Sequence, residues 1–330
     1  MKSQGRILWI DDNPERRKFA SHIKDESGLS VDFCDVKGKK FADYLSDVLE
    51  RRQPALVILD HVLDKTASEK RVFKTGASVA EVLRYKWPSC PIICVTAAEK
   101  MKFIDERTKR LYDDIFLITE FGTVLPRFRV VARDFRRVSS SRLRKPDDLL
   151  QLLDTPKPDR QRLLAMLPED LKKDFGDPSL ASRLYAWVQH VLLERPGFLY
   201  DDLWAATFLG ITPKAFAKIG KRFSRAAYKG VFAFPNRRRW WTSILSDVLY
   251  RLCPPQPGEM PWEIGRRLKG VTRRDYSECD VCGEPLPQTV AYLDVISKER
   301  RPMHLKCTVP HPGFKKEMFF EEIRMMRGRE

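Results

Sequence analysis

The sequence predicts a multidomain chain: an α/β domain with a five-stranded parallel sheet, a mainly helical middle domain, and a small α+β module held by zinc. Three observations lead to this prediction. Strand-like apolar runs alternate with helix-like segments over the first 125 residues, a basic region with helical spacing follows, and paired Cys and His residues lie near the C-terminus. Alternating strands and helices are typical of a parallel sheet covered on both faces.

The first region contains five apolar runs that are strand candidates. They are the segments 6–10, 31–36, 55–60, 91–96 and 114–119. Segments with helical spacing lie between and after them, at 15–23, 40–52, 76–87, 99–112 and 124–137. Nearly continuous Val, Ile and Leu in such runs indicates strands that are buried on both faces.

The net charge of +16 is unevenly distributed along the chain. Residues 1–125 contain 22 Lys and Arg against 20 Asp and Glu, whereas the rest of the chain contains 39 against 25. A strongly basic second part indicates contact with polyanions such as nucleic acid, although charge also serves solubility. No apolar run is long enough to span a membrane and the start has no signal-peptide pattern, so a cytoplasmic protein without a membrane partner is expected.

Two changes in composition predict domain boundaries. The segment 136–148 is rich in Ser and Arg and contains a proline, and the segment 253–265 is dense in proline. Such stretches are typical of linkers. We therefore expect three parts, at residues 1–138, 139–252 and 253–330.

Acidic residues follow the predicted strands at their carboxyl ends. Asp11 and Asp12 end the first strand, Asp60 ends the third, and Thr96 ends the fourth. Because the carboxyl ends of parallel strands form one edge, these side chains are expected to converge there. Clustered carboxylates suit Mg²⁺, which offsets their repulsion. Helix capping is an alternative reason for acids after a strand, but it does not explain the residues at the other two strand ends.

Residues 5–138 resemble the receiver domain of two-component response regulators. The resemblance is based on the segments 7–17, 55–63, 74–97 and 114–122 taken together. It implies a flavodoxin-like fold and the following roles: phosphoryl acceptor, Asp60; Mg²⁺ site, Asp11, Asp12, Asp60 and the backbone carbonyl of Val62; switch residues, Thr96 and Phe116.

One position departs from the family pattern. The family has a Lys-Pro step after its fifth strand, where this chain has Thr119 and Glu120. The cation that pairs with the phosphoryl group is therefore missing there; Lys100 or Lys102 could replace it, although the sequence does not show this. Both a working phosphoryl acceptor and a pseudo-receiver that binds only metal or protein stay open.

The middle region contains a helix-turn-helix pattern. A helix-like segment stops at Gly210, and Thr212-Pro213 opens a second one, as an N-cap residue followed by proline does. The segment 205–216 resembles the helix-turn-helix motif, and 228–241 is predicted to form the hairpin of a winged helix. The expected nucleic-acid contacts are Lys214, Lys218, Lys221, Arg222, Arg225, Arg237, Arg238 and Arg239. A protein-binding winged helix, with its aromatic residues in the core, is the alternative.

The C-terminal region contains a pattern of metal ligands. Cys279 and Cys282 are separated by two residues, as are His304 and Cys307, with 21 residues between the two pairs. Three thiolates and one imidazole complete a tetrahedral Zn²⁺ shell with no open position, which indicates a structural site. The spacing resembles treble-clef and zinc-ribbon modules and predicts a hairpin between the ligand pairs.

Together these patterns predict a response regulator of the two-component type, with an atypical receiver coupled to a basic output region that binds nucleic acid. The alternative is a non-catalytic adaptor whose pseudo-receiver assembles a protein complex. No nucleophile–base arrangement is present, so an enzyme is not expected. A cognate kinase or another protein is the expected partner, and the sequence leaves a homodimer open.

Overall fold

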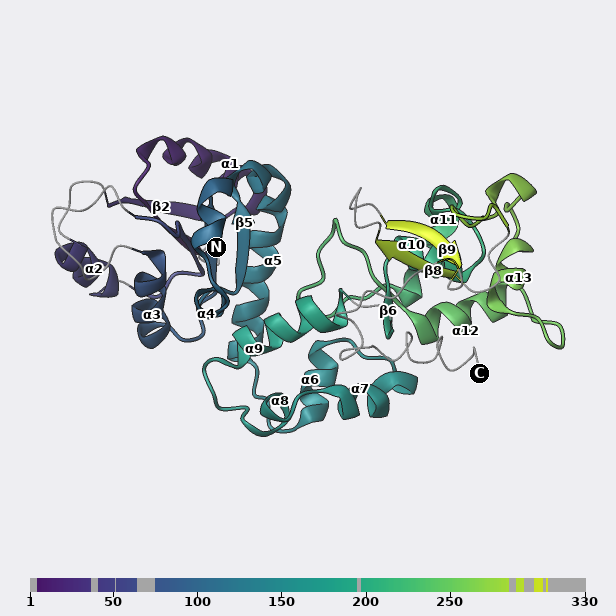
Figure 1. Ribbon diagram of the computed structural model, residues 1–330. Helices are drawn as coiled ribbons and strands as arrows, with labels where there is room; N and C mark the ends of the chain where they lie inside the picture. Colours follow the sequence, from purple (N-terminus) through teal and green to yellow (C-terminus); the bar gives the residue numbers. More distant parts are fainter. Residues whose placement is uncertain are drawn as a thin grey trace. The chain divides into compact units, whose positions relative to one another are not determined.

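The computed structural model of the chain describes residues 5–36, 41–50, 52–63, 75–194, 197–284, 289–293, 300–304 and Cys307. The chain divides into two compact units (Figure 1). Unit 1 consists of Met1–Pro146 and Pro168–Ala186, and unit 2 of Asp147–Leu167 and Trp187–Glu330. None of the helices in the described residues is long and apolar enough to cross a membrane.

Unit 1 is an α/β fold with an additional helical segment. Its strands are β1 (Arg6–Asp11), β2 (Ser30–Asp35), β3 (Leu56–Leu59), β4 (Ile92–Thr96) and β5 (Asp114–Leu117). Its α-helices are α1 (Phe19–Ser27), α2 (Phe41–Glu50), α3 (Gly76–Lys86), α4 (Glu106–Lys109), α5 (Phe121–Ser140), α8 (Glu169–Lys173) and most of α9 (Leu180–Trp187). The 3₁₀ turns in its described residues are η1 (Pro14–Lys18), η3 (Ala98–Phe103) and η4 (Ile118–Glu120).

The five strands form one parallel sheet in the order β2-β1-β3-β4-β5. This is the flavodoxin-like order, in which the strand order reverses between β1 and β3. The predicted parallel sheet is therefore confirmed. Because β1 and β3 are neighbours, with Ile10 opposite Leu59, their carboxyl ends meet at the same edge.

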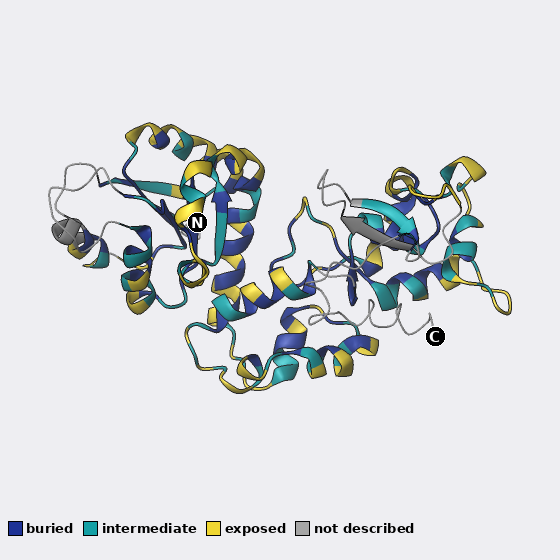
Figure 2. Ribbon diagram, viewed as in Figure 1, coloured by how far each residue is buried: buried dark blue, intermediate teal, exposed yellow. Residues whose placement is uncertain are grey.

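Both faces of the sheet are covered, as the apolar runs predicted (Figure 2). On one face, Leu8 and Ile10 of β1 belong to a buried cluster that includes Leu83 of α3. On the other, the ring of Trp9 lies 5.2 Å from that of Phe121 in α5. Alternate residues of one strand thus enter two cores, which explains why the run is apolar throughout.

The helix predicted over 99–112 is interrupted. Its first part is the turn η3, and α4 starts anew after Ile104, whose backbone is extended. The Asp105 carboxylate accepts a hydrogen bond of 2.7 Å from the Thr108 N–H and so caps the start of α4. A capping aspartate favours a helix start over helix continuation, which overrides the apolar spacing.

Residues 168–186 pack in unit 1 although 147–167 belong to unit 2. Tyr185 of α9 is 1% exposed, its ring lies 5.6 Å from that of Phe135, and its hydroxyl donates to Asp114. Arg84 of α3 donates to the Ser182 hydroxyl at 3.1 Å. The receiver-like fold therefore includes a segment that follows it by some distance in the sequence.

Unit 2 is mainly helical in its described residues. Its α-helices are α6 (Pro146–Leu152), α7 (Arg160–Met166), α10 (Asp202–Phe208), α11 (Pro213–Ile219), α12 (Thr242–Leu252) and α13 (Pro261–Arg266). Short 3₁₀ segments are η5 (Lys157–Asp159), η7 (Gly220–Ala226) and η8 (Arg273–Asp275), and η6 (Val188–Leu192) is a short π-helix. Two antiparallel pairs join β6 (Leu199–Tyr200) with β7 (Trp240–Trp241) and β8 (Thr289–Leu293) with β9 (Arg300–His304).

The helix-turn-helix geometry forms around Gly210. The side chains of Asp201 and Thr212 cap the starts of α10 and α11. Gly210 has a φ of +65°, and a Cβ there would lie 2.5 Å from the carbonyl oxygen of Trp262. Glycine is thus needed both for the left-handed backbone and for the close approach of α13.

The ends of the segment predicted as a wing, 228–241, lie beside each other: Ala227 forms an antiparallel bridge with Trp240, and the Tyr228 N–H donates to the Arg239 carbonyl at 2.9 Å. Its last two residues also pair with Leu199–Tyr200, ahead of α10. Val231, Phe232 and Phe234 are buried, and the Val231 N–H donates to the Leu152 carbonyl at 2.9 Å. The Arg237 N–H donates to the Phe234 carbonyl at 3.1 Å, so a turn forms at Pro235-Asn236, while the apolar side chains before it are buried in the core.

Candidate functional site

Three carboxylates lie together where β1 and β3 end. The Asp60 N–H donates to the Ile10 carbonyl at 3.1 Å, which places the residue after β3 beside the end of β1. Carboxylate oxygens of Asp11, Asp12 and Asp60 all lie within 4.8 Å of one another, and all three residues are buried. The structure thus brings together the acids that the sequence placed at one edge, and we call this cluster the acidic rim.

Asp11 has three fixed hydrogen-bond donors. Its Oδ2 accepts from Trp9 Nε1 at 3.1 Å and from Arg16 Nη1 at 2.7 Å, and its Oδ1 accepts from the Asn13 N–H at 2.9 Å. Burial raises the pKa of Asp11 to about 6, with Arg16 lowering it and Asp60 raising it further. The charged form of this acid therefore depends on the cations around it.

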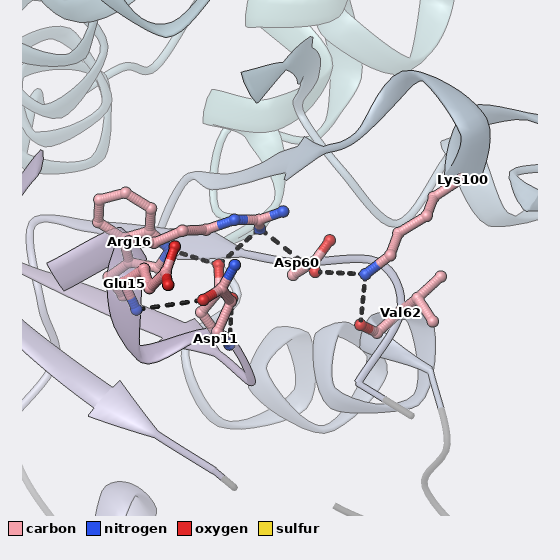
Figure 3. A network of polar contacts seen from close by, with 8 residues as sticks. Asp11, Glu15, Arg16, Asp60, Val62 and Lys100 are labelled. Carbon is pink, nitrogen blue, oxygen red and sulfur yellow. Dashed lines mark hydrogen bonds and ion pairs between the residues drawn. The ribbon is translucent and has the colours of Figure 1, made fainter. Parts of the chain in front are cut away.

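The cation deepest in the rim is Arg16, which the sequence reasoning missed (Figure 3). Its Nη1 lies 2.7 Å from Asp11 Oδ2 and 3.2 Å from Asp60 Oδ2, and its side chain is only 9% exposed. Burial opposes its charge, but the acids raise the pKa of Arg16 above its ordinary value. An arginine five residues after Asp11 was the only signal in the sequence.

Lys100 is the second cation at the rim. Its Nζ lies 3.1 Å from Asp60 Oδ2 and donates to the Val62 carbonyl at 3.3 Å (Figure 3). Thr119 is exposed, and the Glu120 carboxylate accepts from the Leu117 N–H at 3.2 Å. Of the two lysines that could replace the missing one, the structure brings Lys100 to Asp60.

The predicted switch residues flank this edge. Thr96 is fully buried, and neither its Oγ1 nor Asp60 Oδ1 has a hydrogen-bond partner among the described residues. Phe116 is buried in β5, with the Arg127 guanidinium 4.8 Å from its ring centroid. Arg127 in turn pairs with Asp114 at 2.9 Å.

The donor set of the rim fits a hard divalent cation. Three carboxylates and the Val62 carbonyl are the oxygen ligands that Mg²⁺ prefers, and Asp60 Oδ1 is buried without a partner among the described residues. Unpaired buried oxygens are costly and so favour a ligand at this point. However, Arg16 and Lys100 already contact the Oδ2 of Asp60, so a cation and these side chains compete for the same acids.

The four predicted zinc ligands also lie together. One ligand atom from each of Cys279, Cys282, His304 and Cys307 lies within 4.8 Å of the others. The predicted hairpin between the ligand pairs is confirmed as β8–β9, with Thr289 opposite His304. Burial raises the pKa of Cys279, but the N–H groups of His304, Cys282 and Val281 outweigh it and lower that pKa to about 6. This donor set fits Zn²⁺.

The cysteine cluster is attached to the helix-turn-helix. Ile211 forms a bridge with Tyr276, and the Ser277 N–H donates to the Gly210 carbonyl at 3.1 Å. Arg266 of α13 lies over the ring of Tyr276 at 4.8 Å. Contacts therefore run across residue 253, where the sequence predicted a boundary.

The basic residues predicted to contact nucleic acid fall into two groups. Those of α11 and η7 are all exposed: Lys214, Lys218, Lys221, Arg222 and Arg225. By contrast, Arg237 pairs with Glu194 at 2.6 Å and Arg238 with Asp202 at 2.7 Å. Arg239 is 8% exposed and donates to the Leu193 carbonyl at 2.8 Å. Arg239 therefore holds unit 2 together, whereas the Arg238 side chain stays 54% exposed beside its ion pair.

Comparisons with known proteins find solved structures that are similar to part of the chain. No protein-family model matches the sequence, and no curated protein sequence matches it. The chain is similar to a CheY-like response regulator receiver domain protein from Methanospirillum hungatei, with 17% identity and a TM-score of 0.31 over 41% of this chain and 98% of that one.

Two further solved structures are similar to part of the chain. One is a response regulator from Thermotoga maritima in complex with Mg²⁺-BeF, with 21% identity and a TM-score of 0.28 over 37% of this chain and 93% of that one. The other is the receiver domain of a response regulator from Bacteroides fragilis, with 18% identity and a TM-score of 0.31 over 39% of this chain and 97% of that one.

Proposed function

We propose that the chain is a response regulator of the two-component type, in which Asp60 accepts a phosphoryl group from a kinase or a small acyl phosphate. The observation that supports this most is the contact of Lys100 Nζ with Asp60 at 3.1 Å, beside Asp11 and Asp12. A nucleophilic carboxylate with a fixed cation and metal-binding acids around it is the arrangement that phosphoryl transfer to aspartate requires.

In this proposal an oxygen of Asp60 forms the new P–O bond, while the donor's bond to phosphorus breaks and its leaving group takes the electron pair. Mg²⁺, when bound to the acids of the rim, neutralises charge on the phosphoryl oxygens. Lys100 pairs with the phosphoryl group in place of the family's lysine, whose position is occupied by Thr119 in this chain. The Thr96 hydroxyl, which has no partner among the described residues, can donate to the acyl phosphate.

Incubation with an acyl phosphate donor and Mg²⁺ tests the acceptor. We expect an acid-stable, base-labile phosphate adduct in the intact mass, which Asp60→Asn abolishes and Lys100→Gln slows. Lys102→Gln is the matched control, because Lys102 lies over the ring of Phe103 at 5.2 Å. An adduct that survives Asp60→Asn, or its absence from the unmodified chain, contradicts the proposal.

For the output region we propose nucleic-acid binding through α11 and η7, without catalysis. Lys214, Lys221 and Arg225 are exposed and make no hydrogen bond or ion pair with the described residues. Cations on the second helix of a helix-turn-helix are placed to contact phosphates. Affinity should fall steeply with salt, and Lys214→Gln should reduce the salt slope by about 1. Lys109→Gln in unit 1 should leave it unchanged, and salt-independent binding contradicts the proposal.

A non-catalytic adaptor is the second candidate. It is favoured by Arg16, whose guanidinium already neutralises Asp11 and Asp60. Under this alternative, a protein partner binds equally well to the unmodified chain and to Asp60→Asn. A response regulator instead changes its output when Asp60 is phosphorylated, so the same binding assay after incubation of both proteins with the acyl phosphate donor and Mg²⁺ separates the candidates.

A further inference from the structure

Arg16 is the one residue of the turn η1 that points into the protein. Pro14, Glu15, Arg17 and Lys18 on either side are exposed, whereas the Arg16 side chain is 9% exposed. The turn is held by Asn13, whose side chain accepts from the Glu15 N–H, and by proline at its first position. A buried arginine at the surface-facing edge of a sheet has a specific electrostatic reason.

That reason is found in the two acids that Arg16 joins. Its Nη1 lies 2.7 Å from Asp11 Oδ2 at the end of β1 and 3.2 Å from Asp60 Oδ2 after β3 (Figure 3). One guanidinium therefore bridges carboxylates from two different strands. Bridging and neutralising two carboxylates is also what a divalent cation does at such an edge.

The charges of the rim make Arg16 and a divalent cation compete for the same acids. With Asp11, Asp12 and Asp60 ionised, three negative charges face the two positive charges of Arg16 and Lys100. A divalent cation bound to the same oxygens would lie within a few ångströms of the guanidinium. At this separation, like charges oppose one another strongly enough to change affinity by tenfold or more.

We propose that Arg16 is a built-in competitor for the divalent cation: it holds the metal-free acidic rim together and has to leave before Mg²⁺ binds. The inference rests on the proposed function, since it concerns the metal site of the same rim. The affinity for Mg²⁺ is then reduced by the fraction of molecules in which Arg16 is displaced. Regulation of this chain would include release of Arg16 as well as transfer of the phosphoryl group.

Calorimetric titration of the full chain with Mg²⁺ tests the competition. Arg16→Gln keeps much of the side-chain volume but removes the charge, so we expect its Kd for Mg²⁺ to fall by at least about tenfold. Arg17→Gln is the matched control, because the neighbouring guanidinium lies over the Phe33 ring at 5.4 Å, outside the rim. Its Kd should equal that of the unmodified chain. Mg²⁺ has little affinity for thiolates, so the cysteine cluster does not interfere.

Two outcomes of the titration separate failure of this inference from failure of the proposed function. Equal Mg²⁺ affinity in the unmodified chain and in Arg16→Gln overturns the competition but leaves the rim as a metal site. Absence of Mg²⁺ binding from both proteins overturns the competition and the proposed metal site together. If the double variant with Arg16→Gln and Asp60→Asn no longer binds Mg²⁺ in the titration, the ion binds at the rim.

Thermal unfolding gives a second readout that does not require tight binding. Without metal, Arg16→Gln leaves buried acids with one counter-charge fewer, so its Tm should be lower in chelator and recover in millimolar Mg²⁺. The Tm of the unmodified chain should change little between these conditions. An equal loss of Tm with and without Mg²⁺ would mean that Arg16 serves packing alone, and it would overturn the inference.

Discussion

The hydroxyl of Tyr185 should contribute measurably to the attachment of residues 168–186 to the receiver-like fold. The side chain is 1% exposed, and its hydroxyl donates to Asp114 Oδ2 at 2.6 Å. Tyr185→Phe removes this one oxygen and leaves the ring against Phe135. The substitution therefore isolates the hydrogen bond from the packing.

The magnitude follows from the charge of the acceptor. Hydrogen bonds to charged groups contribute about 1.5–3 kcal/mol, more than those between neutral groups. Asp114 keeps Arg127 at 2.9 Å after the substitution, so it is not left as an unpaired buried charge. We therefore expect a loss of about 2 kcal/mol in the free energy of opening of this segment, near the middle of that range.

Native-state hydrogen exchange is the suitable assay, because the chain has two compact units and global unfolding need not be two-state. Amides of α9 should exchange faster in Tyr185→Phe by a factor that corresponds to this loss. Tyr85→Phe is the matched control, because Tyr85 is 92% exposed in the same unit. If both variants exchange alike, the bond to Asp114 does not hold the segment, and the reasoning is wrong.

Three further predictions concern the metal clusters and the rim. Cys282→Ala should lower the zinc content by one equivalent and increase hydrogen exchange in the β8–β9 hairpin, and a chelator should have the same two effects. Cys253→Ala is the control, because Cys253 lies outside the cluster and the metal should be kept. Unchanged zinc content in Cys282→Ala would reject the site. Gly76→Ala should lower the Tm and slow phosphorylation, because the added Cβ would lie 2.1 Å from the backbone carbonyl oxygen of Asp60, the predicted phosphoryl acceptor. Gly122→Ala is the control and should be neutral or stabilising, because the space around Gly122 is open. In chelator, the free energy of unfolding should fall by up to about 3 kcal/mol as pH rises from about 4 to 6, because the raised pKa of Asp11 means that the folded state holds a proton that the unfolded state has released. Asp11→Asn should remove that pH dependence, and a slope that persists in it would assign the proton to another group.

The sheet and its acidic edge were predictable because local patterns determine them. Each strand is an apolar run that ends at a polar residue, and parallel order follows from the helices between the strands. The position of Asp60 beside Asp11 then follows from the adjacency of β3 and β1. The clustering of the four predicted zinc ligands followed for a similar reason, since two short gaps and one hairpin bring these residues together.

Features that depend on distant side chains were not predictable in this way. The conformation of Arg16 follows from the field of two acids on different strands, and a linear pattern does not contain that field. Likewise, the pairing of β7 with β6 joins segments on either side of α10 and α11, and a local pattern does not predict it. In both cases tertiary contacts determine the arrangement.

The path of the chain between the two units has a consequence for how such a protein is divided or recombined. The polypeptide passes from one unit to the other after residues 146, 167 and 186. A single cleavage at any of these points leaves at least one fragment that carries a portion of both units. A gene fusion that exchanged only residues 1–138 would leave Tyr185 behind without its Asp114, and a crossover after residue 186 would take Leu152 away from Val231, so a working chimaera needs a replacement that retains the partner surface.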